Sequence, residues 1–328
     1  MNSENAMPAT CFGKIPSRGD FVRGTGQYQL ITLLDRWVSR AMEALSEDSR
    51  WKIAYDGGSA VDFLFAGASR RISVVGHLRP SSDSSGRRFP LITAAMIERD
   101  DSLMFRCGPS GLQQSYAALA RIAESGTAGA EASQLLGELD DVNCAADFNS
   151  AISTDPLGHF VRQTTLESLA EMLALNNGSE ALRRIILAVG LLMCPVLGQG
   201  AVHIDKDLVL PLPAGDRYRH HVAGLWLYLT SAFLRRTTVE LQVLIERRIE
   251  HPHLILGFNG DSPSPLLSTL TPEAMAEHRI LLIDPEWIEE QTEITRDYGI
   301  AKLSSYLAQP AITLEQVVTT FREVFLGE

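Results

Sequence analysis

The segment of residues 11–21, CFGKIPSRGDF, places glycine, proline and charged side chains in an order that could bind phosphate. In a GxxxxGK[ST] loop, backbone amides cradle the phosphates, and the hydroxyl group after the lysine holds magnesium. Gly13 and Lys14 fit this pattern, but Pro8 stands where the first glycine is needed and Ile15 where the hydroxyl is needed. The sequence therefore excludes a nucleotide loop of this kind.

The same segment contains Arg18-Gly19-Asp20, a tripeptide that acts as an adhesion signal on exposed loops of extracellular proteins. Residues 1–15 have neither the basic start nor the apolar core of a signal peptide. We therefore interpret the tripeptide as a polar turn in which Gly19 adopts an unusual backbone angle. The sequence predicts a cytoplasmic location.

A second segment, residues 80–91 with the sequence PSSDSSGRRFPL, could also carry chemistry. Arg87 and Arg88 could bind a carboxylate or phosphate as forked donors, or they could pin their loop to Asp20 or Asp83. One hypothesis is a small hydrolase or phosphate-handling enzyme that uses these four side chains. The alternative is that the two turn-rich segments brace each other, with Arg18 and Asp20 as anchors.

Other catalytic and metal-binding patterns are weak. The close histidine pairs, His220-His221 and His251-Pro252-His253, lie outside any HExxH motif and far from cysteine in the sequence. No GxSxG elbow occurs, and we interpret residues 108–111, GPSG, as a turn. The sequence predicts no catalytic residue, no metal ligand and no cofactor.

The bulk composition limits the class of partner. The 328 residues carry a net charge of −11 and their basic residues form pairs without a long run, which disfavours nucleic-acid binding. The longest uncharged stretch, residues 185–202, is interrupted by Pro195, so we predict a buried helix and no membrane insertion. Four widely spaced cysteines indicate buried thiols in a reducing compartment.

The spacing of apolar residues predicts the helices and strands that would position the two segments. Apolar residues at steps of three and four predict a helix over 28–45, and a second helix is predicted over 113–123. We predict strands over 51–55, 61–65, 71–78 and 89–97.

The second half has the same mixture of elements. Helices are predicted over 166–175, 180–194 and 217–234, and strands over 203–212, 239–246, 253–258 and 279–283, of which the second and third could pair. Short helices are predicted from 263 and 272, and further helices over 285–291, 294–307 and 313–325, the last with Thr313 and Gln316 as a capping box. The irregular order favours an α/β (α+β) fold with mixed or largely antiparallel sheets flanked by helices. We predict two domains, 1–125 and 151–328, joined by a linker over 126–150.

Taken together, the two segments resemble a known family. Residues 11–21 resemble the "GKLPxRGDF" opening of the TagF (ImpM) proteins of type VI secretion, and residues 80–91 resemble their "PSxDxxGRRFPL" loop. Residues 34–37, LDRW, match the tryptophan-bearing helix between them. Residues 257–260, GFNG, with the following Ser-Pro, resemble the "GFNGxSP" segment of longer members, so the resemblance extends over both predicted domains.

The resemblance implies a cytoplasmic, non-enzymatic protein that represses type VI secretion after translation. It also implies protein–protein binding, with the forkhead-associated scaffold component as one partner; a structural subunit of the apparatus is a further alternative. The residues that the family motifs place at a binding interface are Gly13, Lys14, Pro16, Arg18, Gly19, Asp20, Phe21, Trp37, Ser81, Asp83, Gly86, Arg87, Arg88, Phe89 and Pro90.

Overall fold

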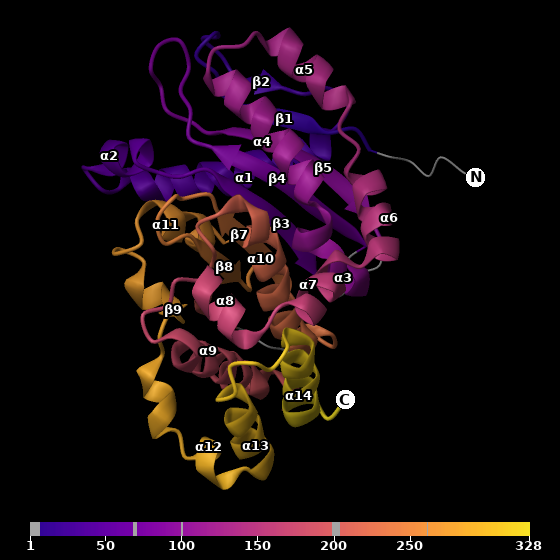
Figure 1. The fold of residues 1–328 in the computed structure, drawn as a ribbon. Coiled ribbons are helices and arrows are strands. Elements are labelled where there is room, and N and C mark those ends of the chain that lie inside the picture. The colour runs from indigo at the N-terminus through magenta and orange to yellow at the C-terminus, as the bar shows by residue number, and fades with distance from the viewer. Residues whose placement is uncertain (1–6, 68–70, 100, 199–203, 261) are drawn as a thin grey trace.

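The computed structural model describes residues 7–67, 71–99, 101–198, 204–260 and 262–328, whose strands form a mixed sheet (Figure 1). Among these residues the sheet has nine strands in the order β2-β1-β5-β4-β3-β7-β8-β6-β9. The strands are β1 (Thr10–Gly13), β2 (Val22–Arg23), β3 (Val61–Gly67), β4 (Ile72–Arg79), β5 (Leu91–Glu98), β6 (Asp207–Pro211), β7 (Glu240–Glu246), β8 (His253–Gly257) and β9 (Arg279–Leu281).

The predicted sheet type is confirmed, because neighbouring strands are antiparallel except for the parallel pair β6–β9. The pairing of β7 with β8 also agrees with the sequence. Strands from both predicted domains belong to one continuous sheet, because β3 pairs with β7 along its whole length, from Val61 opposite Glu246 to Gly67 opposite Glu240. The division into two domains stays a prediction.

Helices cover the two faces of this sheet. The first group is α1 (Tyr28–Ser46), α2 (Trp51–Asp56), α3 (Asp101–Gly111), α4 (Gln113–Thr127), α5 (Ala132–Asp140), α6 (Cys144–Thr154), α7 (Pro156–Gln163), α8 (Leu166–Met172) and α9 (Gly178–Met193). The second group is α10 (Asp216–Ser231), α11 (Ser264–Leu270), α12 (Glu293–Arg296), α13 (Tyr298–Leu307) and α14 (Leu314–Leu326). Short 3-10 helices are η1 (Cys194–Gly198), η2 (Ala232–Leu234), η3 (Ala276–His278) and η4 (Glu286–Glu290).

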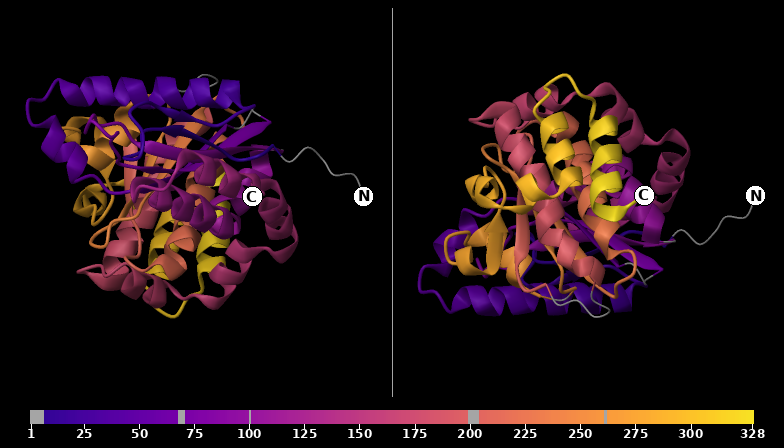
Figure 2. Two further views of the ribbon diagram at one scale, coloured as in Figure 1. Left: turned by 90° about the horizontal axis from the view of Figure 1, so that it is seen from above. Right: turned by 90° about the horizontal axis from the view of Figure 1, so that it is seen from below.

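The long helix α1 lies along one face of the sheet, opposite the larger group of helices (Figure 2). It forms where the sequence predicts it, and its apolar stripe is buried against the sheet. Leu34 and Trp37 share an apolar cluster with Phe63 of β3 and with Leu266 of α11. Since 3.6 residues complete one turn, steps of three and four place these side chains on a single face.

The other face is covered by α3, α4, α10 and their neighbours, which enclose the larger apolar core. The predicted linker, residues 126–150, is largely helical here. Leu135 and Leu139 of α5 and Phe148 of α6 are buried in this core. The acidic residues of this segment therefore lie on the outer or partly exposed sides of packed helices, while most of its large apolar residues face inward.

Two local predictions are wrong. Residues 51–55 form helix α2 and not a strand; Asp48 begins the turn by accepting the backbone N–H of Arg50 at 2.7 Å. Residues 108–111 lie within helix α3 and do not form a turn. A Cβ atom on Gly224 of α10 would lie 2.5 Å from Ser110 Oγ, so small residues in both helices permit a close crossing.

The C-terminal helices α13 and α14 pack beyond the sheet beside α9 (Figure 1). The predicted capping box at the start of α14 is confirmed: Thr313 Oγ1 accepts from the Gln316 backbone, and the Gln316 side chain accepts from the Thr313 backbone. None of the helices in the described part of the chain has both the length and the apolar character needed to cross a membrane.

Candidate binding site at the two motif loops

The two sequence motifs lie side by side and brace each other, as the second of the two hypotheses predicts. We call residues 13–21 and 80–90 the motif loops. The Ser84 backbone N–H donates to the Arg18 carbonyl at 2.9 Å, and Ser81 Oγ donates to the Lys14 carbonyl at 2.7 Å. Gly13 has φ +141°, and a Cβ atom there would lie 2.0 Å from the Pro90 carbonyl oxygen. Glycine is therefore required where the first loop passes the second.

A buried carboxylate stands at the centre of the contact. Asp83 is 3% exposed, and its Oδ2 accepts from Lys14 Nζ at 2.9 Å and from Arg87 Nε at 2.7 Å. Its Oδ1 accepts the backbone N–H groups of Ser85 at 2.9 Å and Arg87 at 3.0 Å. The hydrogen bond from Lys14, helped by those from Arg87 and Ser85, holds the pKa of Asp83 well below its ordinary value. The four hydrogen bonds that this carboxylate accepts all come from residues of the motif loops.

The anchors differ from those expected. The sequence suggests Arg18 and Asp20, but the side chain that crosses between the loops from the first motif is Lys14. Asp20 is exposed, and its Oδ1 accepts only a local bond from the Phe21 backbone N–H at 2.8 Å. Arg87 crosses in the other direction, with Nη2 donating to the Gly19 carbonyl at 2.5 Å. The tripeptide of residues 18–20 therefore lies at the surface.

Helix α2 supports the second loop from behind. The Tyr55 hydroxyl donates to the Ser81 carbonyl and accepts the Ser81 backbone N–H, both at 2.9 Å. Arg88 donates to both oxygens of Asp56, at 2.7 and 2.6 Å, and this pairing lowers the pKa of Asp56. Tyr55 ends the segment predicted as a strand and Asp56 directly follows it, so nothing in the sequence indicated that either supports the loop. Together with Pro16 and Gly86 they border a pocket of about 360 Å³.

Aromatic rings fill the space beneath the charged groups. Phe21 stacks on Phe12 with centroids 5.3 Å apart, and Phe89 meets both rings edge-on. Lys14 Nζ lies 5.2 Å from the centroid of Phe21, within the range of a cation–π contact. Trp37 of α1 is 2% exposed, and its ring packs against Phe63 and Phe65 of β3, so it presents no surface to a partner.

A second charged cluster joins the two halves of the chain and was not found from the sequence. We call Asp62, His77, His220 and Arg247 the seam cluster. Asp62 is fully buried; its Oδ1 lies 2.7 Å from His77 Nδ1, and its Oδ2 lies 2.8 Å from His220 Nε2. Arg247 Nη1 donates to both oxygens at 3.3 Å. Burial alone would raise the pKa of Asp62, but the hydrogen bonds from the two histidines outweigh it and lower the pKa.

The histidine pairs considered in the sequence behave differently from one another. His220 belongs to the seam cluster, whereas its neighbour His221 stacks on Phe160. His253 lies beside Glu246 on β7. Among the residues that the structure describes, no three His, Cys, Asp or Glu side chains are grouped to hold a metal ion.

Comparison with known proteins agrees with the motif geometry. Residues 10–142 match the family described as "TagF N-terminal domain, Type VI secretion system-associated". The chain carries a TagF N-terminal domain. This domain contains both motif loops and α1 between them, so the family resemblance is confirmed over the residues that form the candidate site. Association with type VI secretion follows from the family.

Among solved structures, the crystal structure of PA0076 from Pseudomonas aeruginosa PAO1 is similar, with 18% sequence identity and a TM-score of 0.35. The similarity covers 44% of this chain and 78% of that one. No curated protein matches the chain.

Proposed function

We propose that this TagF-domain protein represses type VI secretion after translation by binding a component of the secretion apparatus in the cytoplasm. The forkhead-associated scaffold protein is the first candidate partner. One observation carries the proposal. The two motif loops, which are separate in the sequence, hydrogen-bond to each other and form one surface. Both lie within the residues that match a type VI secretion-associated family.

The charge arrangement supports a binding role over a hydrolytic one. An enzyme that used Asp20, Asp83, Arg87 and Arg88 would need these groups to converge on an open site. Instead, Asp83 is buried and all of its hydrogen bonds come from the loops themselves. Arg88 pairs with Asp56, and Asp20 is exposed to solvent. A carboxylate held in this way is a poor general base, because its pKa lies far below neutral pH.

The exposed part of the surface consists of Pro16 and residues 18–20 and 84–87. Among the described residues, no side chain forms an ion pair with Arg18 or Asp20. The buried Lys14–Asp83 contact fixes the backbone beneath them, so these exposed groups are held in place before a partner arrives. Such preorganisation lowers the entropic cost of binding.

The experiment is a pull-down from cells that express the secretion locus, using the purified chain as bait. The double variant Arg18→Ala/Asp20→Ala should capture less of the apparatus component and keep the melting temperature of the wild type. The matched control is Arg236→Ala/Asp141→Ala, which removes one charge of each sign from exposed positions elsewhere. Control and wild type should bind alike.

Secretion provides the second readout. Deletion of the gene should raise secretion, and overproduction should lower it. If deletion left secretion unchanged and no apparatus protein co-purified, the proposal would be wrong. A stoichiometric amount of the protein in purified assemblies would favour a structural subunit, and turnover in a phosphatase screen would favour the hydrolase.

A further inference from the structure

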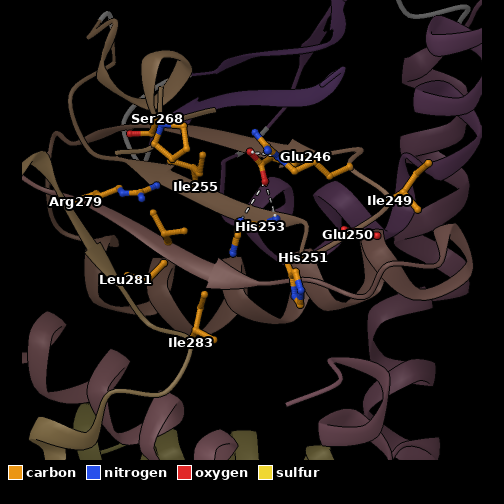
Figure 3. A pocket seen from close by; sticks show the side chains of 13 residues that line it. Glu246, Ile249, Glu250, His251, His253, Ile255, Ser268, Arg279, Leu281 and Ile283 are labelled. Carbon is orange, nitrogen blue, oxygen red and sulfur yellow. Dashed lines mark hydrogen bonds and ion pairs between the residues drawn. The ribbon is translucent and has the colours of Figure 1, made fainter. Parts of the chain in front are cut away.

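A cavity of about 640 Å³ opens on the C-terminal part of the sheet, away from the motif loops (Figure 3). Its floor is a row of three apolar side chains, Val209 of β6, Ile255 of β8 and Leu281 of β9. Val209 lies opposite Ile255 in one strand pair and opposite Leu281 in the other, so the row runs straight across three strands. A cavity of this size with an apolar floor is typical of sites for small organic ligands.

One wall of the cavity is the end of β7 and the connection from β7 to β8. Glu246 is 2% exposed, and its Oε2 accepts the backbone N–H of His253 at 3.0 Å and faces His253 Nδ1 at 3.2 Å. Its Oε1 accepts from Arg248 Nε at 3.3 Å, and Arg248 Nη2 donates to the Thr269 carbonyl at 2.6 Å. The negative charge of Glu246 is thus compensated inside the wall and does not repel an anion in the cavity.

Arg279 lines the opposite wall, and no carboxylate among the residues that the structure describes pairs with it. Figure 3 shows its guanidinium extending toward Ile255, on the side away from Glu250. Ser268 lies on the same side, but it is 1% exposed and its Oγ is buried, so it offers no donor to the cavity. Arg279 is therefore the polar group on this side that can meet a ligand.

We propose that this cavity binds an organic monocarboxylate with an apolar chain. The carboxylate pairs with the Arg279 guanidinium, and the chain covers Ile255 and Leu281. Leu281 is 47% exposed, so a bound chain would remove apolar surface from water. The inference does not depend on the proposed role in secretion.

The probe is octanoate, titrated into the full-length protein by isothermal titration calorimetry, with 1-octanol as the neutral analogue. Octanoate should bind the wild type, and octanol should bind at least about tenfold more weakly, because a charge-assisted hydrogen bond is lost. Arg279→Gln should weaken octanoate binding by a similar factor. Arg236→Gln, an exposed arginine elsewhere, is the matched control and should leave affinity unchanged.

Leu281→Asp provides a second variant, because this half-exposed position accepts a polar side chain and the new carboxylate would repel octanoate. Melting temperatures establish that each variant is folded. The proposal is overturned if octanoate does not bind the wild type, if octanol binds as tightly as octanoate, or if Arg279→Gln binds octanoate as the control does.

Discussion

The carboxylate at the start of β6 allows a quantitative test of the electrostatics in the C-terminal half. Asp207 is 5% exposed, and its Oδ2 accepts from Ser264 Oγ at 2.7 Å. Burial raises its pKa to about 6, although the hydrogen bond from Ser264 and the positive charge of His278 oppose the rise. We predict that Asp207→Asn stabilises the protein at pH 8 and not at pH 4.

The magnitude follows from linkage. The native state binds more protons than the unfolded state between pH 3.8 and about pH 6. The stability that protonated Asp207 provides is therefore fully present below pH 3.8 and is lost as the pH rises through about 6. The interval between the two pKa values corresponds to about 3 kcal/mol. An asparagine amide adds donors that need partners, at a cost of about 1 kcal/mol, which leaves a net gain of about 2 kcal/mol at pH 8.

The assay is urea denaturation of wild type and Asp207→Asn at pH 3.5, 6 and 8, followed by tryptophan fluorescence. The free-energy difference between the two proteins should change sign across this range, with the variant less stable at pH 3.5, where the wild-type carboxyl is protonated in both states, and more stable at pH 8. The control is Asp141→Asn, an exposed position whose neutralisation should give a curve parallel to the wild type. Parallel curves for Asp207→Asn as well would refute the reasoning.

Four further changes test other parts of the fold. Asp62→Ala removes the carboxylate between buried histidines and should cost about 3–5 kcal/mol of unfolding free energy; a loss below about 1 kcal/mol would contradict the role of the seam cluster. Gly13→Ala should lower the melting temperature, because its Cβ would clash with the second motif loop. Burial raises the pKa of Cys11 to about 12, so a thiol reagent at pH 8 should modify the less buried Cys194 first, as mass spectrometry of peptides would show. A fragment ending at residue 142 should aggregate on size-exclusion chromatography, because it exposes the edge of β3 that pairs with β7.

Elements with strong local periodicity could be predicted from the sequence. Helix α1 forms where apolar steps of three and four predict it, and the capping box of Thr313 begins α14. Short segments were less predictable. Apolar and polar side chains alternate over part of residues 51–55, as in a strand, yet this segment forms a helix. In that helix the Tyr55 hydroxyl bonds to the Ser81 backbone, and Ile53 is 73% exposed.

The candidate site could be predicted in part. The bracing of the motif loops follows from their turn-rich composition, but the choice of Lys14 as the anchor does not, since a lysine beside a glycine gives no local sign of burial. The seam cluster could not be predicted because its members lie far apart in the sequence. Asp62 and Arg247 are 185 positions apart, and only the pairing of β3 with β7 brings them together.

The motif loops depend on parts of the chain outside the family match. Tyr55, which holds the second loop, packs in a small apolar cluster with Leu45 of α1 and Leu267 of α11. Leu267 precedes Ser268, which lines the C-terminal cavity, so one packed layer underlies both surfaces. Because interiors are close-packed and deform little, α11 helps to set the position of α2 and thereby of the loop it supports. The C-terminal half is therefore part of the structural support of the TagF N-terminal domain, through this cluster on one face and the β3–β7 pairing within the sheet.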